Sequence, residues 1–153
     1  MQFRSWLAKL DNVADFLQSP LLLVIRLYWG WQFAQTGWGK LMNLERTAGF
    51  FESLDIPLPR ANAIMAGAVE CGGGVLLALG LFARPAAVPL IFTMLVAYWT
   101  ADRDALNAIL SDSDKFVTAA PFLFLLASVI VLAFGPGKLS LDALFGQKQG
   151  AVK

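Results

Sequence analysis

The chain has 153 residues, of which 58% are apolar and only 15% are charged. Soluble domains carry about 25% charged residues, and one soluble core of this length could not bury so much apolar surface. The formal net charge of +1 gives no strong field for recruiting nucleic acid, so we expect no nucleic-acid partner. The composition indicates a membrane protein in contact with a lipid bilayer.

Two residue types that usually hold redox cofactors are scarce. The sequence has no histidine, and its one cysteine, Cys71, cannot form an intramolecular disulfide. Imidazole is the commonest side chain at haem and transition-metal sites. We therefore expect no metal site, no cofactor bound by this chain alone, and no catalysis by the chain without a partner.

Residues 1–19 form the first predicted element. Apolar side chains such as Phe3, Trp6 and Leu10 recur there at helical spacing, with Lys9 and Asp15 mostly on other faces. This pattern predicts an amphipathic helix that lies in the membrane interface. A lead-in helix packed on the rest of the protein fits the same pattern, and both alternatives stay open.

Residues 20–134 form the membrane part of the prediction, and residues 135–153 form a C-terminal tail. The membrane part contains four apolar stretches, each near the roughly 20 residues that cross a bilayer as a helix. Polar or Pro/Gly breaks separate them, and the three-residue connection after the second stretch requires an antiparallel hairpin. The predicted fold is an all-α, integral membrane, antiparallel four-helix bundle. The four spans are residues 20–42, 61–82, 86–101 and 116–134.

The distribution of basic residues predicts the orientation. Cytoplasmic loops carry the excess of Lys and Arg. Six basic residues lie on the side that holds both termini, against five on the other side, so both termini are expected in the cytoplasm. The first group is Arg4, Lys9, Arg84, Lys138, Lys148 and Lys153; the second is Lys40, Arg46, Arg60, Arg103 and Lys115.

The first two spans each carry a narrow stripe of unusual residues. At 100° per residue, Arg26, Gly30, Phe33, Gly37 and Lys40 share one face of the first span. Small residues around one carboxylate share a face of the second span, and small residues let membrane helices approach closely. We expect the two stripes to face each other, with Glu70 between Arg26 and Lys40. The second stripe is Ala63, Ala66, Gly67, Glu70, Gly73 and Gly74.

Glu70 is the strongest functional pointer, because an ionisable side chain within an apolar span is rare and costs about 2.5 to 3.5 kcal/mol even on lenient insertion scales. One interpretation is an ion pair that locks two helices together. The other is a polar pocket for a quinone, a substrate or a proton, enriched by amide donors from the first span. The candidate pocket residues are Arg26, Gln32, Gln35, Lys40 and Glu70.

Several short motifs, in order and spacing, resemble the DoxX family over residues 20–142. They are Arg26-Leu-Tyr-Trp-Gly30, Gly37-Trp-Gly-Lys40-Leu, Ile56-Pro57, Glu70-Cys-Gly-Gly73-Gly-Val-Leu-Leu, Gly80-Leu-Phe-Ala-Arg84 and Gly135-Pro-Gly-Lys-Leu-Ser140-Leu-Asp142. The resemblance implies a four-helix bundle in a bacterial-type inner membrane with cytoplasmic termini. It also implies kinship with the small subunit of thiosulfate:quinone oxidoreductase and with components associated with quinol oxidases.

Two functions follow as alternatives. In the first, the chain is the membrane subunit of a respiratory-type redox complex, anchors a partner that carries the redox cofactor, and offers a quinone site in the polar pocket. In the second, it is a non-enzymatic bundle that binds a lipid or small molecule, or that supports a larger membrane complex.

Overall fold

The computed structural model describes residues 2–150, with side chains described for residues 13–146. Every regular element in that range is a helix, which confirms the all-α prediction. The side chains of residues 3–10, on which the predicted amphipathic pattern depends, and residues 151–153 of the predicted tail lie outside the described set. The helices are α1 Gln2–Met42, α2 Leu44–Ser53, α3 Pro59–Leu79, α4 Ala83–Thr100, α5 Arg103–Asn107, α6 Ser113–Thr118, α7 Pro121–Phe134 and α8 Leu141–Gly150.

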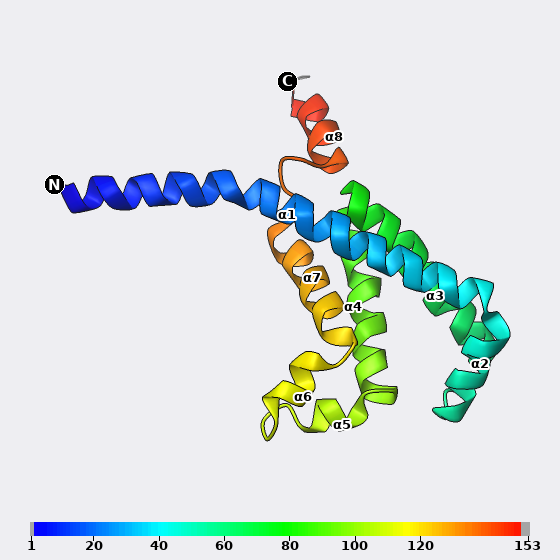
Figure 1. The fold of residues 1–153 in the computed structure, drawn as a ribbon. Helices are drawn as coiled ribbons and strands as arrows, with labels where there is room; N and C mark the ends of the chain where they lie inside the picture. The colour runs from blue at the N-terminus through cyan, green and yellow to red at the C-terminus, as the bar shows by residue number, and fades with distance from the viewer. Residues whose placement is uncertain (1, 151–153) are drawn as a thin grey trace.

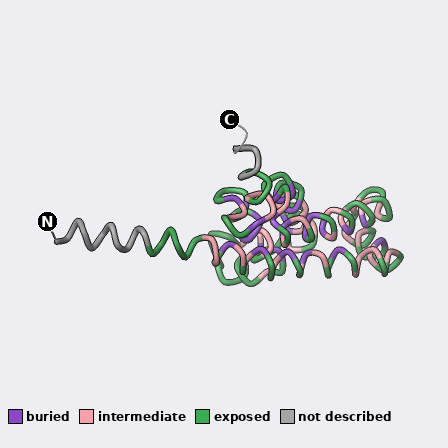
Figure 2. Tube along the Cα trace, turned by 90° about the horizontal axis from the view of Figure 1, so that it is seen from above, coloured by how far each residue is buried: buried purple, intermediate pink, exposed green. Residues whose placement is uncertain are grey.

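The first helix organises the molecule. The C-terminal half of α1 lies antiparallel along α3, and this is the most extensive helix pair (Figure 1). The next most extensive pair is α4 with α7, and α3 also packs on α4. The exposed stretch of α1 that precedes Pro20 projects away from the other helices (Figure 2).

The helix α1 is continuous through Pro20, where the sequence suggests a boundary between a surface helix and the first span. Proline lacks the N–H that an interior helical residue donates, so it usually ends or kinks a helix. Here the helix extends without a break before and after Pro20. The lead-in residues and the first predicted span therefore form one element of 41 residues.

Pro59–Leu79, which is α3, is the one described helix that is both long enough and apolar enough to cross a membrane. The predicted span over residues 116–134 is interrupted, because Ala119 adopts an extended conformation between α6 and α7. The apolar helix α7 that follows has 14 residues, about 21 Å at 1.5 Å per residue. The four-span bundle therefore remains a prediction.

The hydrophobic core lies where α1, α3, α4 and α7 meet. Phe33 of α1 is fully buried against Leu77 of α3 and Val131 of α7. Phe124 of α7 packs edge-on against Phe33, with ring centroids 4.6 Å apart. This core holds the α1–α3 pair in a fixed register, which decides how the polar side chains of the two helices meet.

Candidate functional site

The interface between α1 and α3, here called the α1–α3 seam, is built on glycines. A Cβ on Gly37 would overlap the backbone nitrogen of Cys71 and lie 2.6 Å from the carbonyl oxygen of Gly67. Two turns away along each helix, Gly30 and Gly74 meet in the same manner, with 2.6 to 2.7 Å from a Cβ to the opposite backbone. The two helices can approach this closely only because these positions have no side chain, so the facing stripes predicted from the sequence are confirmed.

Gly73 differs from the other predicted packing glycines. A Cβ built on Gly73 would lie 3.0 Å from Cγ of Leu90, a residue of α4. Its absent side chain therefore makes room for α4 and not for α1. The small-residue face of α3 serves two neighbours, which one helical stripe cannot reveal without knowing where α4 packs.

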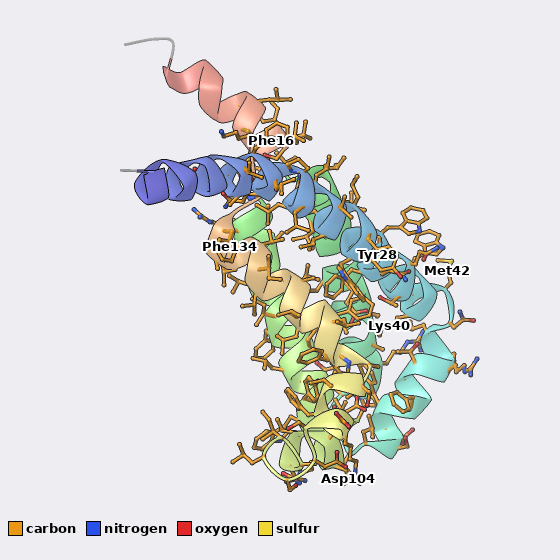
Figure 3. All side chains as sticks on the ribbon, turned by 60° about the vertical axis from the view of Figure 1, so that its left-hand side comes forward. Phe16, Tyr28, Lys40, Met42, Asp104 and Phe134 are labelled. Carbon is orange, nitrogen blue, oxygen red and sulfur yellow. The ribbon has the colours of Figure 1, made fainter. Side chains whose placement is uncertain are left out.

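Three polar side chains meet near the C-terminal end of α1, and we call them the Lys40–Glu70–Thr36 cluster. Lys40 Nζ forms an ion pair with Glu70 Oε2. Thr36 Oγ1 lies 3.2 Å from the same oxygen and 3.0 Å from the carbonyl oxygen of Phe33. The Lys40 side chain, labelled in Figure 3, is 29% exposed, whereas that of Glu70 is 3% exposed.

The register of the α1–α3 seam places Glu70 beside Thr36 and Lys40, so only one of the two cations expected on either side of it makes contact. The predicted contact between Glu70 and a cation or polar group of the first span is confirmed for Lys40 and Thr36. Arg26 lies on the same face of α1 but 10 residues before Thr36, about 15 Å along the helix. Which cation reaches Glu70 is decided by the helix register.

Arg26 is instead enclosed at the opposite end of the seam. Its side chain is fully buried, and Nη2 donates to the carbonyl oxygen of Leu139 at 2.6 Å. A Cβ on Gly80 would overlap Arg26 Nη1, and Gly80 has a φ of +65°, which also favours glycine. Nε and Nη1 of Arg26 have no hydrogen-bond partner among the described residues.

The sequence alone did not predict that the C-terminal segment covers Arg26. Asp142 accepts hydrogen bonds from the backbone nitrogens of Phe82 at 2.8 Å and Ala83 at 3.0 Å, so it caps the start of α4. Its own backbone nitrogen donates to the carbonyl oxygen of Gly80 at 2.9 Å. The motif around Gly135-Pro136-Gly137 indicated a helix end there, but it did not indicate which part of the chain the following residues contact.

The two glutamines predicted for the pocket do not join the Lys40–Glu70–Thr36 cluster. Gln32 is half-buried, and its amide nitrogen lies 3.5 Å from the hydroxyl oxygen of Tyr28. Gln35 is exposed, on the side of α1 that faces away from α3. Helical angles already separate Gln35 from Lys40, so a plot of all polar positions on one helical wheel would have found this.

Two shallow hollows in the described structure lie away from this cluster. One lies at the turn between α4 and α5 and involves Asp102, Arg103 and Lys115. The other lies between α1 and the C-terminal segment, beside Ser19 and Lys138. The Lys40–Glu70–Thr36 cluster is a partly exposed group on the flank of two helices, able to donate hydrogen bonds through an ammonium and a hydroxyl and to accept them through a carboxylate.

Comparison with known proteins places the sequence in a family. The family model described as DoxX matches residues 21–103. The chain is 34% identical over 128 residues to the inner membrane protein YphA of Escherichia coli, covering 80% of this chain and 88% of that protein. It is 32% identical over 139 residues to the membrane protein Rv3486 of Mycobacterium tuberculosis, covering 86% and 85%.

No solved structure matches the chain. The family match nevertheless includes both Lys40 and Glu70 and extends over more than half of the sequence. The chain therefore belongs to the DoxX family of membrane proteins.

Proposed function

We propose that this DoxX protein is the membrane subunit of a respiratory-type redox complex, which anchors a cofactor-bearing partner and offers a quinone site. The location proposed is the bacterial cytoplasmic membrane, with four crossings and both termini in the cytoplasm. The two named relatives are membrane proteins, and one of them is named as an inner membrane protein. Neither name states a redox role or a quinone site, so these are part of the proposal.

The observation that carries the proposal is the Lys40–Glu70–Thr36 cluster on the flank of α1 and α3. A quinone carbonyl accepts hydrogen bonds, which Lys40 and Thr36 can donate, and a hydroquinone hydroxyl donates them, which Glu70 can accept. Lys40 is partly exposed while Glu70 is nearly covered. A head group that arrives from the bilayer therefore meets the ammonium first.

The composition supports a division of labour within such a complex. The chain has no histidine and one cysteine, so it lacks the usual side chains for holding haem, copper or an iron–sulfur cluster. A bound quinone would supply two-electron, two-proton chemistry. A partner would carry the flavin, haem or metal, and this chain would hold the partner at the bilayer.

Quinone titration tests the site. The purified protein, in detergent, is titrated with a short-chain ubiquinone analogue and a menaquinone analogue, and binding is followed by tryptophan fluorescence. Lys40→Gln and Glu70→Gln should each weaken binding about tenfold, as expected for a lost hydrogen bond to a charged group. Arg60→Gln is the matched control, because Arg60 forms an exposed pair with Glu45 at 3.4 Å.

Purification from native membranes in mild detergent tests the partner. A redox protein that stays with the chain at constant ratio through two chromatographic steps, together with extracted quinone, supports the proposal. Binding that does not saturate in the titration, with no redox protein retained, would move the assignment to the second candidate.

The second candidate is a non-enzymatic bundle that binds a lipid or small molecule or supports a larger complex. It is favoured by the direct pairing of Lys40 with Glu70, which satisfies both charges within the chain. A paired cluster of this kind can fix two membrane helices without any ligand. In that case Glu70→Gln changes stability and leaves quinone binding absent in both proteins.

A further inference from the structure

Arg26 is the one described residue whose buried side-chain nitrogens lack a hydrogen-bond partner. A guanidinium carries five N–H donors, and here only Nη2 has an acceptor, the carbonyl oxygen of Leu139. Nε and Nη1 are covered and unpaired within the described part of the chain. Unpaired buried donors are costly, because nothing replaces the water that they lose on burial. The guanidinium is therefore able to accept a better partner than the one it has.

A short C-terminal segment covers this guanidinium, and we call residues 137–142 the strap. After α7 the chain passes over α1 and continues into α8 (Figure 1). The carbonyl oxygen of Leu139 accepts from Arg26, and Ser140 lies against the same place. A Cβ on Gly80 would overlap Arg26 Nη1 and lie 2.6 Å from the Cβ of Ser140. Arg26 can therefore meet a ligand only when the strap moves away.

The strap also carries a carboxylate to the amino end of α4. Asp142 accepts hydrogen bonds from the backbone nitrogens of Phe82 at 2.8 Å and Ala83 at 3.0 Å. The amino end of a helix as long as α4, which has 18 residues, attracts anions. The charge of Asp142 also stabilises that of Arg26, although no ion pair joins these two described side chains. The carboxylate thus lies where two sources of positive potential meet.

We propose that this place is a binding site for a phosphate-type oxyanion, held by Arg26 and the start of α4, and that Asp142 occupies it when no ligand is bound. Arginine binds oxyanions through two parallel N–H groups, and the start of a helix adds backbone N–H groups. A phosphate group has at least two free oxygens, so it can accept from the guanidinium and from the helix together. Asp142 accepts from the helix alone.

Occupation by Asp142 keeps the affinity of the closed protein for an external anion low. A carboxylate in the same chain is present at a high effective concentration, so a free ligand competes with it poorly. The apparent affinity is also reduced by the fraction of molecules in which the strap is closed. Removal of this carboxylate should therefore strengthen anion binding. A carboxylate that serves only as a helix cap would give no such gain.

This oxyanion site is separate from the Lys40–Glu70–Thr36 cluster. Lys40 follows Arg26 by 14 residues on α1, which is about 21 Å at 1.5 Å per residue. The two sites share no residue. A failure of quinone binding would therefore leave the oxyanion site unaffected.

Calorimetric titration of the full-length protein in an uncharged detergent tests the site. Inorganic phosphate is the first probe, and dihexanoyl phosphatidylglycerol is the second. Dihexanoyl phosphatidylcholine, whose head group is zwitterionic, is the control lipid. Asp142→Ala should bind phosphate about five- to tenfold more tightly than the unaltered protein, because loss of a helix cap favours the open strap by about that factor.

A second substitution tests the role of the guanidinium. Arg26→Gln, combined with Asp142→Ala, should weaken binding about tenfold, as expected for a lost hydrogen bond to a charged group. Arg84→Gln in the same background is the matched control and should leave the affinity unchanged. Arg84 is an exposed cation near the strap, and its described hydrogen bonds go to the carbonyl oxygens of Leu132 and Ala133 in α7.

The two probes distinguish the sources of the phosphate group. Binding of both probes supports a site for the phosphate group itself. Binding of phosphatidylglycerol alone assigns the site to an anionic lipid, and binding of inorganic phosphate alone assigns it to a soluble phosphate. The proposal is overturned if neither probe binds, if Asp142→Ala brings no gain, or if Arg26→Gln brings no loss.

Limited proteolysis of the unaltered protein keeps the test decisive if Asp142→Ala folds poorly. A probe that displaces Asp142 opens the strap, so cleavage after Lys138 should accelerate with phosphate and not with sodium chloride at the same ionic strength. Arg26→Lys keeps the charge but loses the planar N–H fork, and it should reduce this acceleration. Slower cleavage, or an unchanged rate at the highest phosphate concentration, would reject the exchange between Asp142 and the external anion.

Discussion

The two ends of the α1–α3 seam each hold a cation of α1, but they satisfy it differently. At one end, Lys40 pairs with the carboxylate of Glu70 from the neighbouring helix. At the other end, Arg26 is fully buried, donates to the backbone carbonyl of Leu139, and keeps two nitrogens without a described partner. The first end is made by helices alone, and the second depends on a segment that returns from the C-terminus.

The Lys40 contact joins two helices that pack side by side, whereas the Arg26 contact joins distant parts of the chain. Lys40 and Glu70 lie in helices that pack along each other, so the pair forms wherever the glycine seam forms. Arg26 and Leu139 are 113 residues apart in the sequence. Their contact depends on a C-terminal segment that Asp142 holds at the start of α4, so we expect the Arg26 end to open more easily than the Lys40 end. Four predictions test this comparison.

The largest effect is expected in the middle of the seam, on which both ends depend. Gly37→Ala would place a methyl group against the backbone of Cys71 and Gly67, which cannot move aside as a side chain can. Overpacking usually costs about 1 to 3 kcal/mol, and the backbone contact puts this change at about 3 kcal/mol. Thermal unfolding in detergent measures it.

Gly39→Ala is the matched control, because a Cβ there would meet no atom within 4 Å. Its thermal midpoint should stay the same or rise by up to about 4 °C, since alanine favours the helix over glycine. Equal midpoints for Gly37→Ala and Gly39→Ala would mean that the seam is not closely packed.

The second prediction concerns the Lys40 end. Lys40→Met leaves the nearly covered carboxylate of Glu70 without its cation, and it should cost about 2 to 3 kcal/mol. Glu70→Gln keeps an acceptor for Lys40 and Thr36, and it should cost about 1 kcal/mol. The double variant Lys40→Met/Glu70→Leu should recover most of the loss, as double-mutant analysis of thermal unfolding would reveal. Additive losses would show that the pair is not coupled.

The third prediction concerns the Arg26 end. Asp142→Ala removes the acceptor for the backbone nitrogens of Phe82 and Ala83, and the loss of a helix cap costs about 1 kcal/mol. The C-terminal segment should detach locally, so limited proteolysis after Lys138 should accelerate while cleavage elsewhere does not. Asp102→Ala is the control, because Asp102 precedes α5 without a side-chain cap hydrogen bond. Equal cleavage rates in the two variants would argue that the hydrogen bonds of Asp142 do not hold the C-terminal segment in place.

The smallest effect is expected at an exposed pair outside the seam. Arg60 and Glu45 lie 3.4 Å apart, but their side chains are 68% and 81% exposed. Exposed pairs contribute about 0 to 1 kcal/mol, so Arg60→Gln should change the thermal midpoint by less than about 2 °C. A larger shift would mean that exposure does not weaken this ion pair relative to the Lys40–Glu70 pair.

Sequence reasoning was most successful where the signal is local. The period of the apolar residues indicates helices, and the spacing of Gly30 and Gly37 against Gly67 and Gly74 identifies the faces that meet. It was least successful where a third helix takes up a residue of the stripe, or where the backbone breaks within an apolar stretch. Gly73 makes room for Leu90 of α4, and the break at Ala119 shortens the last apolar helix.

The sequence by itself determined the membrane class, the helical fold, the α1–α3 contact and the association of Glu70 with a cation. Each of these follows from periodicity and side-chain size, which are fixed along a single helix. Only the tertiary structure decided that Lys40 is that cation and that Leu139 and Asp142 close over the other end. These depend on helix register and on chain segments far apart in sequence, because packing against a third and fourth helix selects one register among several that the stripes allow.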